Sequence, residues 1–432
     1  MNISPEMILI WLFVVGVFGG LLFAAFNLIG AAIYDMMEVR QSNKLRKVPN
    51  NKVYRHRPLL SIVIPVHNEK MVIERCLDSL LKSSCRKFEI IIADDKSSDN
   101  TREIVRAYIK SHPNRSIRLV AKRLNGGRGA AIDAGLRHAK GDLVMALDAD
   151  CMVAKYALRN MVRHFADGRT AAVAANIRIM DTGNMISLLQ QFDYLISFRS
   201  KKFNTVANCE YIIGGAGATY QRSVIEQLKG FDHSMQTEDI EMSLRIARVL
   251  GNNTKRLKYA SNVVIFTEPV PTYKSLFKQR FRWKFGSLQA MYKHRQLLFS
   301  FHREHSKLLT LLRLPFVLWC ELLLVLEPIY FGYFLYLAII NRNATLFASA
   351  SLVMTLLIAI VVWSDEHLAM RSRLRLSVYA PMMYLAFFIM TAIQVGAAIK
   401  SFINVHGLIG KRKVVGAYVS PERIGQNFNV SS

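Results

Sequence analysis

The chain has 432 residues, of which 52% are hydrophobic and 20% are charged. Its 57 Lys and Arg against 31 Asp and Glu give a formal net charge of +26 at pH 7. This apolar content excludes a disordered or fibrous chain, and the length allows about two to three domains. The five cysteines are too few for a disulfide scaffold and show no Cys-x-x-Cys spacing, so we expect reduced thiols and no structural zinc site.

The first apolar run extends from Met7 to Tyr34 without a charged residue, which is long enough to cross a bilayer as a tilted helix. Residues 1–6 contain no Lys or Arg, whereas basic residues follow the run at Arg40, Lys44, Arg46 and Lys47. Positive residues favour the cytosolic side of a membrane. We therefore predict an external N-terminus, with one transmembrane helix and a basic linker in residues 1–58.

The C-terminal part of the chain is apolar again. The segments 308–340, 343–364 and 376–399 carry few or no charges, which predicts about three membrane helices in residues 306–400 and a polar tail in 401–432. Three crossings place the basic Lys411-Arg412-Lys413 outside, against the positive-inside tendency. A hairpin within 308–340 would bring the tail back inside, but its length barely suffices for two crossings, and we favour three.

Membrane segments on both sides predict a multi-pass protein of the plasma membrane whose central region is cytosolic. The excess of positive charge is then expected to face anionic lipid. Nucleic acid is not an expected partner of a chain anchored in this way. A phosphate-bearing substrate or a polyanion stays open as a partner of the basic residues.

Residues 59–271 show an α/β pattern. The short apolar runs at 59–65 and 88–93 are typical of strands buried on both faces. Residues 116–121 and 142–147 are expected to form a third and a fourth strand, and stretches of about 10–15 residues between the strands are helical. This alternation predicts a mostly parallel sheet with helices on both faces. Such sheets bind ligands at the carboxyl ends of their strands, where this chain places Asp94-Asp95 and Asp148-Ala-Asp150. The pattern therefore indicates a nucleotide or metal site.

Two motifs near these strand ends suit phosphate chemistry. Asp148 and Asp150 are hard oxygen ligands for Mg²⁺ or Mn²⁺ shared with substrate phosphates, although plain loop acidity is the alternative. The loop Asn125-Gly-Gly-Arg128-Gly offers backbone N–H groups and one cation to a phosphate, although glycine pairs are also common turns.

Two further motifs have both a functional and a structural interpretation. The small-residue run Gly214-Gly215-Ala-Gly-Ala-Thr-Tyr220 permits close backbone approach to a sugar ring, or tight packing of a strand on a helix. In Thr237-Glu238-Asp239, the threonine is a candidate N-cap and the acids suit the first helical turn. The functional alternative is a general base that deprotonates an acceptor hydroxyl.

Residues 272–305 mix aromatic and basic residues in a pattern typical of an amphipathic helix on the cytosolic membrane face. They contain Gln279-Arg280-Phe-Arg282-Trp283. Interfacial anchoring explains such residues, but an Arg and Trp pair also suits binding a pyrophosphate and stacking on a sugar.

In this order and spacing, the motifs resemble those of the membrane-embedded processive family-2 glycosyltransferases. That family includes the synthases of cellulose, chitin, hyaluronan and poly-N-acetylglucosamine. The resemblance runs from about Leu59 to Trp283. It implies a GT-A fold, which is Rossmann-like, and inverting transfer of a sugar from a nucleotide-sugar donor.

The resemblance also implies roles for individual residues. Pro65, Asn68 and Glu69 match the first-strand signature beside the nucleobase, and Asp95 matches the aspartate that contacts uracil. Asp148 and Asp150 match the residues at the UDP diphosphate and its Mg²⁺ or Mn²⁺ ion. Asp239, preceded by Glu238, matches the catalytic base. One family motif marks the processive members and contacts the acceptor and the diphosphate. It is matched here by Gln279, Arg280, Arg282 and Trp283.

Two positions depart from the family pattern. Arg128 stands where many relatives have Lys, which keeps the charge. Tyr220-Gln221-Arg222 differs from the usual basic pair after the small-residue run, which puts the acceptor in doubt and not the reaction.

We therefore predict an inverting, processive transferase that polymerises a UDP-sugar, with N-acetylglucosamine favoured, into a β-linked polysaccharide extruded across the membrane. Its expected partners are the donor, the growing polysaccharide, the lipid bilayer and accessory export proteins. Two alternatives stay open. One is a transferase that adds a single sugar to a lipid carrier, and the other is a non-enzymatic transporter that uses Glu321 and Glu327 within the membrane.

Overall fold

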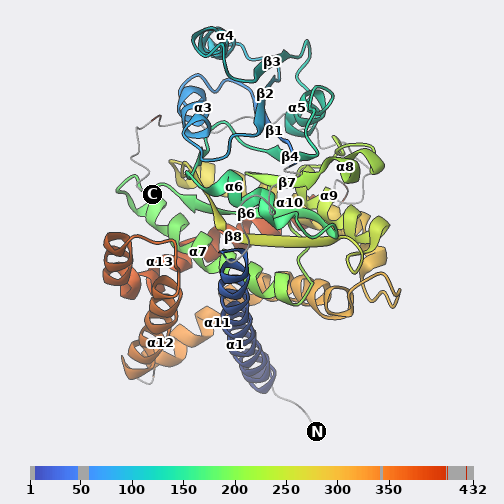
Figure 1. Ribbon diagram of the computed structural model, residues 1–432. Helices are drawn as coiled ribbons and strands as arrows, with labels where there is room; N and C mark the ends of the chain where they lie inside the picture. Colours follow the sequence, from blue (N-terminus) through green and yellow to red (C-terminus); the bar gives the residue numbers. More distant parts are fainter. Residues whose placement is uncertain (1–4, 47–57, 341–343, 405, 407–424, 426–432) are drawn as a thin grey trace.

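The structure, a computed structural model, describes residues 5–46, 58–340, 344–404, 406 and 425. An α/β domain lies at one end of the molecule and long helices lie at the other (Figure 1). The strands are β1 (Leu60–Val66), β2 (Phe88–Asp94), β3 (Ile117–Ala121), β4 (Leu143–Ala146), β5 (Met152–Val153), β6 (Thr170–Ile179), β7 (Ala218–Gln221) and β8 (Arg256–Thr267). The helices are α1 (Pro5–Arg46), α3 (Ile73–Leu81), α4 (Thr101–Ser111), α5 (Gly127–Leu136), α6 (Ala157–His164), α7 (Met185–Val206), α8 (Arg222–Gln227), α9 (Glu238–Ile246), α10 (Tyr273–Lys293), α11 (Leu314–Ile340), α12 (Ala344–Trp363) and α13 (Met370–Ile403).

The strands form one sheet in the order β3-β2-β1-β4-β7-β6-β8-β5. The first four in this order are parallel, as are β6 and β8. Strand β7 runs antiparallel to both β4 and β6, and β5 runs antiparallel to β8. The sheet is therefore mixed and mainly parallel, which confirms a Rossmann-like fold of the GT-A kind.

The continuous apolar runs of the strands follow from burial on both faces of the sheet. Ile62 and Ile64 of β1 pack in the core that includes α3, α4 and α6. Val63, between them, packs in the opposite core with α5, α8 and α9. Because successive side chains of a strand point to opposite faces, a strand covered by helices on both sides needs apolar residues at every position.

Helix α1 is attached to the α/β domain at its C-terminal half. The hydroxyl of Tyr34 donates to the carbonyl of Tyr259 at 3.0 Å, and Asp35 pairs with Lys202 of α7. A Cβ on Gly30 would lie 2.4 Å from the ring of Phe203, so glycine is required for the close approach of the two helices. The helix continues to Arg46, well past the uncharged run that predicted it.

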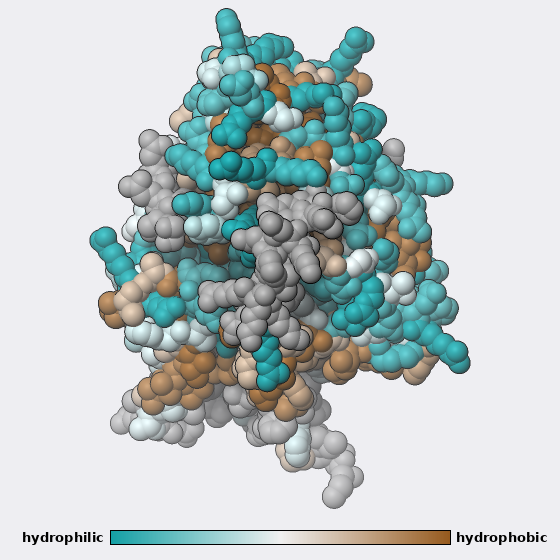
Figure 2. Space-filling model, in the orientation of Figure 1, coloured by the Kyte–Doolittle hydropathy of each residue, from teal (hydrophilic) through white to brown (hydrophobic). Residues whose placement is uncertain are grey.

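The C-terminal helices carry the apolar surface of the molecule. Within the described residues, two segments are long and apolar enough to cross a bilayer, Leu308–Ile329 and Ala386–Ile403, and Ser351–Trp363 is a shorter apolar helix. Hydrophobic residues gather in the lower part of the space-filling view, where Figure 1 places α1, α11 and α12 (Figure 2). The basic linker after Arg46 and most of the predicted polar tail lie outside the described residues.

Candidate functional site

The carboxyl ends of β1 and β2 meet the glycine-rich loop that precedes α5. Asp95, which is buried, accepts hydrogen bonds from Lys122 Nζ at 2.5 Å and from the backbone N–H of Gly127 at 2.7 Å. Asn68, at a φ of 60°, accepts from the backbone N–H of Ser98 at 2.8 Å. The structure thus brings the first-strand motif, Asp95 and the loop to one edge of the sheet, with Asp95 holding the loop in place.

Arg128 is the centre of the second group of predicted residues. Its Nε donates to Asp148 Oδ1 at 2.8 Å, and its guanidinium also pairs with Glu238. The same guanidinium donates to the carbonyl of Gly215 at 2.9 Å. Burial opposes the charge of Arg128, yet the carboxylates of Asp148, Glu238 and Asp239 raise its pKa well above the usual value. Arg128 therefore joins three chain segments that are remote in sequence through one cation.

Asp239 has the electrostatic setting of a general base. Burial, together with the charge of Glu238, raises the pKa of Asp239 to about 6, although Arg128 and Arg282 oppose the rise. A carboxyl group with a pKa near the working pH exchanges protons efficiently in a transition state. The sequence predicted Asp239 as the base; the raised pKa is consistent with that role, which stays a prediction.

Two glycines of the small-residue run permit close packing, although the partner at Gly217 is strand β8 and not the expected helix. The approach to a sugar ring stays a prediction. A Cβ on Gly215 would lie 3.0 Å from Arg128 Nη2 and 3.0 Å from Asp239 Oδ2, so this position separates the cation from the carboxylate. Gly217 has a φ of +72°, and a Cβ there would lie 2.2 Å from the side chain of Ile265 on β8. Gly215 therefore shapes the site, and Gly217 permits tight packing of the sheet.

Replacing Gly215 by Ala is expected to lower the rate of sugar transfer about 10- to 100-fold, because the added methyl group displaces Arg128 or Asp239 from its position. Steady-state kinetics on the purified chain measure this effect. The matched control is Gly168→Ala, where a Cβ meets no atom within 4 Å, and whose rate should equal that of the unmodified chain. Equal rates for both variants would remove Gly215 from the site.

Asp148 and Asp150 have different surroundings. Asp148 is 31% exposed and faces Arg128, whereas Asp150 is buried and accepts a hydrogen bond from Thr267 Oγ1 at 3.0 Å. Within the described residues, no group of three or more His, Cys, Asp or Glu side chains is arranged to hold a metal ion by itself. Mg²⁺ is commonly held by one or two carboxylates together with substrate phosphates. The oxygen donors at this edge of the sheet therefore fit a divalent ion that binds together with a nucleotide.

The motif on α10 lies against α7. Arg280, which is buried, donates from Nη2 to Asp193 Oδ2 at 2.7 Å and lies over the ring of Trp283 at 4.4 Å. The rings of Trp283 and Tyr194 are 6.2 Å apart. Gln279 keeps a buried amide oxygen without a hydrogen-bond partner among the described residues. Arg280 is thus held by a protein carboxylate and an aromatic ring, while Arg282 contributes to the field at Asp239.

Asp193 and Tyr194 are site residues that the sequence interpretation missed. They lie in the middle of an ordinary amphipathic-looking helix, and no spacing between them and α10 could be read from the chain. The one available signal was an acid next to an aromatic residue within a helix, which is too common to select. Their place beside Arg280 and Trp283 depends on tertiary packing of α7 on α10.

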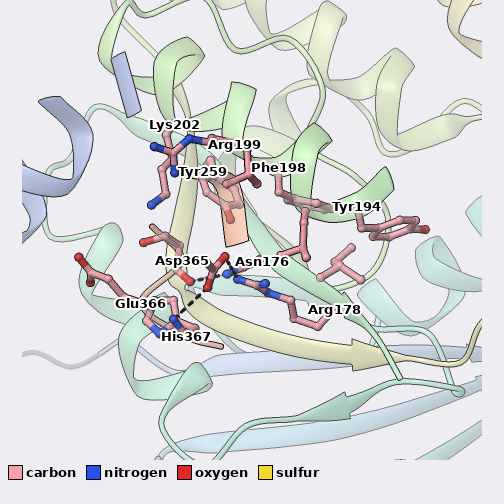
Figure 3. A pocket seen from close by; sticks show the side chains of 14 residues that line it. Asn176, Arg178, Tyr194, Phe198, Arg199, Lys202, Tyr259, Asp365, Glu366 and His367 are labelled. Atoms are coloured by element: carbon pink, nitrogen blue, oxygen red, sulfur yellow. Dashed lines mark hydrogen bonds and ion pairs between the residues drawn. The ribbon is translucent and has the colours of Figure 1, made fainter. Parts of the chain in front are cut away.

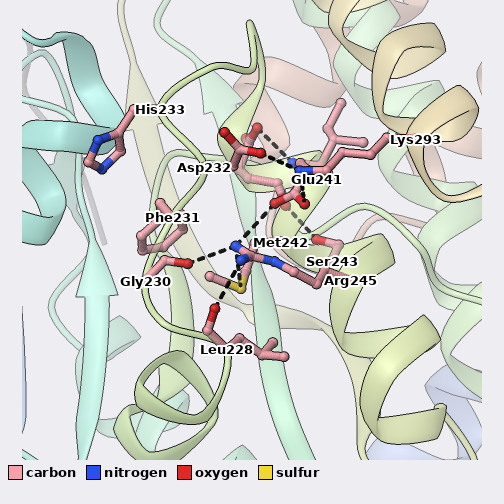
Figure 4. A network of polar contacts seen from close by, with 12 residues as sticks. Leu228, Gly230, Phe231, Asp232, His233, Glu241, Met242, Ser243, Arg245 and Lys293 are labelled. Atoms are coloured by element: carbon pink, nitrogen blue, oxygen red, sulfur yellow. Dashed lines mark hydrogen bonds and ion pairs between the residues drawn. The ribbon is translucent and has the colours of Figure 1, made fainter. Parts of the chain in front are cut away.

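A polar network fixes the helix that carries Asp239. Arg245 of α9 pairs with Glu241 at 3.1 Å and donates to the carbonyl of Gly230 at 2.7 Å (Figure 4). Lys293, at the end of α10, pairs with Glu241 at 3.0 Å and also with Asp232. Burial raises the pKa of Asp232, but hydrogen bonds from Lys293 and Ser234 outweigh burial and lower this pKa to about 2. Asp232 and Glu241, whose pKa values are both lowered, therefore pair with Lys293 as carboxylates near neutral pH, which ties α9 to α10.

A close contact between the Thr237 side chain and a glycine of α10 joins the same two helices. Thr237 occupies the predicted N-cap position of α9, but its side chain makes no capping hydrogen bond. A Cβ on Gly286 of α10 would lie 2.4 Å from Thr237 Oγ1. The threonine thus packs against α10 where a larger residue could not fit, which corrects its expected capping role.

The predicted residues therefore fall into three neighbouring groups. Arg128, Asp148, Gly215, Glu238 and Asp239 form one cluster through direct contacts or a shared glycine. The second group, at the ends of β1 and β2, is Pro65, Asn68, Glu69 and Asp95, and the third, on α10, is Gln279, Arg280, Arg282 and Trp283. Outside these three groups, Asp150 accepts a hydrogen bond from Thr267 at the end of β8. The individual roles assigned to these residues stay predictions.

Comparison with known proteins agrees with this architecture. Residues 61–229 match the family described as glycosyl transferase family 2. Over 260 residues, the chain is 30% identical to the poly-beta-1,6-N-acetyl-D-glucosamine synthase of Staphylococcus aureus (strain COL), covering 60% of this chain and 61% of that protein. The synthase of the same name from Staphylococcus epidermidis is 26% identical over 268 residues, or 61% and 62% of the two chains. The aligned region thus spans about three-fifths of these relatives.

A solved structure shows that the fold recurs over nearly the whole chain. It is a mannosyltransferase from Pyrobaculum calidifontis in complex with GDP-Man and Mn²⁺, with a TM-score of 0.54 and 20% identity, covering 88% of this chain and 99% of that one. The mixed sheet, the carboxylates at its edge and these similarities support a glycosyltransferase. More specifically, the domain over residues 61–229 is similar to glycosyl transferase family 2.

Proposed function

We propose that this chain is an inverting membrane glycosyltransferase that polymerises a UDP-sugar, with N-acetylglucosamine favoured, into a β-linked polysaccharide. The observation that carries the proposal is the cluster of Asp239, Arg128 and Asp148 at the strand ends, in which the pKa of Asp239 is raised to about 6. The similarity to two poly-beta-1,6-N-acetyl-D-glucosamine synthases supports the choice of sugar and of a polymeric product.

In the proposed reaction, Asp239 accepts the proton of an acceptor hydroxyl as that oxygen attacks the anomeric carbon. The bond between this carbon and the β-phosphate oxygen breaks on the opposite face, and UDP leaves with the bonding electrons. Arg128 and Arg282 stabilise the negative charge that develops on the leaving diphosphate. Asp148, with Asp150, would hold Mg²⁺ or Mn²⁺, which when bound supplies Lewis-acid stabilisation of the same charge. Trp283 would stack on the acceptor sugar, next to Tyr194.

We also propose that the protein lies in the plasma membrane in several passes, with its α/β domain on the cytosolic side. The uncharged run 7–34 in α1, the apolar segments Leu308–Ile329 and Ser351–Trp363, and the exposed Trp319 and Trp363 support this placement. The polysaccharide would leave across the membrane, with accessory export proteins as partners.

Nucleotide release from the purified full-length chain tests the proposal. UDP-N-acetylglucosamine with Mn²⁺ or Mg²⁺ should release UDP, and EDTA should abolish the release. The product should run as a ladder on a gel and should yield to a hydrolase specific for β-linked N-acetylglucosamine. UDP release with only a single-sugar lipid product would replace the polymerase by a single-transfer enzyme. Absence of release from every nucleotide sugar, including GDP-mannose, would overturn the proposal.

A further inference from the structure

The connection between α12 and α13 lies on the α/β domain. Asp365 of this connection pairs with Arg178 of β6, and Arg199 Nη1 of α7 donates to Ser364 Oγ at 2.5 Å. Arg373, in the first turn of α13, donates to the carbonyl of Asp365 at 2.7 Å. Figure 3 shows the connection beside Asn176, Arg178 and Tyr259, where it closes one side of a pocket between α7 and the sheet. The N-terminal end of α13 is therefore fixed to the domain.

The same domain also covers the middle of α13. One stripe of the helix is buried at intervals of three and four residues, at Leu376, Ala380, Met383, Ala386 and Met390. This stripe belongs to one apolar cluster with Leu188, Leu189 and Phe192 of α7 and with Leu276 of α10. Residues at such intervals share one face of a helix. Helix α13 therefore lies against the domain over several turns and does not leave it after the first.

The far end of α13 contacts α10. A Cβ on Gly396 would lie 3.1 Å from the ring of Phe277 on α10, and Lys400 Nζ lies 4.7 Å from the centre of the Phe281 ring. At 1.5 Å per residue, the helix rises about 40 Å between Arg373 and Lys400, which exceeds the roughly 30 Å of a hydrocarbon core. If α13 crossed a bilayer, its two ends would lie on opposite sides of the membrane. Here the first end contacts the α/β domain, and the far end contacts α10, which Arg280 joins to Asp193 of α7 in that domain.

The chain beyond α13 gives an independent observation. Gly425 donates its backbone N–H to Glu268 Oε1 at 3.2 Å, and Glu268 pairs with Arg75 of α3 at 3.0 Å. A Cβ on Gly425 would lie 3.1 Å from the side chain of Met71, just before α3. Residue 425 is thus seated on the α/β domain, on its side of any membrane.

We propose that α13 is a membrane-surface helix that lies beside α10 and does not cross the bilayer. The C-terminus then lies on the same side as the α/β domain, and the partner of the outer face of α13 is the lipid surface. That face is apolar and exposed, at Leu374, Val378, Met382, Ile389 and Ile403. Two crossings after the domain, by α11 and α12, return the chain to its starting side.

This arrangement removes a conflict in the sequence. Three crossings after the domain would place Lys411-Arg412-Lys413 on the external side, whereas two keep these residues with the other basic flanks. The inference rests on the membrane placement proposed above and is independent of the glycosyl-transfer reaction. It replaces the predicted three C-terminal crossings by two crossings and one surface helix.

Labelling of single cysteines in the full-length chain tests the proposal. The background carries Cys85→Ser and Cys320→Ser and retains the three buried cysteines. Glu366→Cys reports the α12–α13 connection, Ser432→Cys reports the C-terminus, and His138→Cys reports an exposed site on the domain. A membrane-impermeant maleimide is applied to right-side-out and to inverted vesicles. We expect all three cysteines to react in the same vesicle orientation.

Labelling of either Glu366→Cys or Ser432→Cys in the vesicle orientation opposite to that of His138→Cys would overturn the proposal. Either α13 itself, or an odd number of the helices after the α/β domain, would then cross the bilayer. A fourth variant, Asn2→Cys, reports the external N-terminus and should react in the opposite orientation. If Asn2→Cys is labelled in the same vesicle orientation as His138→Cys, the membrane placement in the proposed function fails. The labelling of Glu366→Cys and Ser432→Cys still shows on which side of the membrane α13 and the tail lie. UDP release by the same variants reports the reaction separately.

Discussion

Replacing Asp239 by Asn is expected to lower the rate of sugar transfer by about 10²- to 10⁴-fold, the usual contribution of a positioned general base. The amide cannot take the proton of the acceptor hydroxyl, whereas Arg128 and Asp148, which we propose to bind the donor diphosphate, are unchanged and keep their mutual hydrogen bond. Donor affinity should therefore stay close to that of the unmodified chain. Turnover assays measure the first effect, and calorimetric titration with UDP measures the second. Undiminished transfer would remove Asp239 from the role of base.

The pH profile provides the control for this assignment. Asp239 acts as a base only when deprotonated, so activity should rise with pH through a midpoint near 6 and be lost as pH falls through it. The charge of Glu238 contributes to the raised pKa, so Glu238→Gln should move the midpoint to lower pH. The residual activity of Asp239→Asn should lack this acidic limb. An unchanged limb in that variant would assign the titration to another group.

Replacing Arg128 by Met is expected to lower the stability of the α/β domain by about 3–5 kcal/mol, the range for removing one partner from a buried charge cluster. The side chain of Arg128 is 13% exposed, and its removal leaves Asp148, Glu238 and Asp239 near one another without this cation. Loss of the same charge should raise the midpoint of the acidic limb, because Arg128 lowers the pKa of Asp239. Thermal unfolding of the purified protein measures the first effect.

The matched control for this experiment is Arg106→Met. Arg106 pairs with Glu103 on the surface of α4, where both side chains are more than 60% exposed, so its loss should change stability by less than about 1 kcal/mol. Arg128→Lys should fall between the two, because it keeps the charge but loses the planar fork that joins Asp148, Glu238 and Gly215. Equal unfolding temperatures for Arg128→Met and Arg106→Met would contradict a structural role for the cluster.

The sequence predicted those parts of the molecule that follow from local pattern. Strands β1, β2 and β4 were visible as continuous apolar runs, because helices cover both faces of this half of the sheet. Strand β3, at the edge of the sheet, contains Arg118 and is only partly buried. The acids at the strand ends were visible because parallel topology places such ends at one edge. Asp239 and Arg128 were found by motif, each within one short segment.

The parts that could not be predicted depend on contacts between remote segments. Strand β7 turns the sheet from parallel to mixed because it pairs antiparallel with both β4 and β6, and its four residues carry no signal of direction. Asp193 meets Arg280 across 87 residues of sequence. Helix α13 is as apolar as a transmembrane span by composition, and only its contacts with α7 and α10 distinguish a surface helix from a crossing.

The close contact of Gly286 with Thr237 has a consequence for how the reaction responds to its surroundings. Asp239, the proposed proton acceptor, stands two residues after Thr237, and Lys293 of α10 pairs with Glu241 of the same helix α9. In the proposed membrane placement, the depth at which α10 rests in the headgroup layer would set the position of this carboxylate relative to the donor. Turnover in bilayers of different acyl length would then follow the vertical displacement of a single helix.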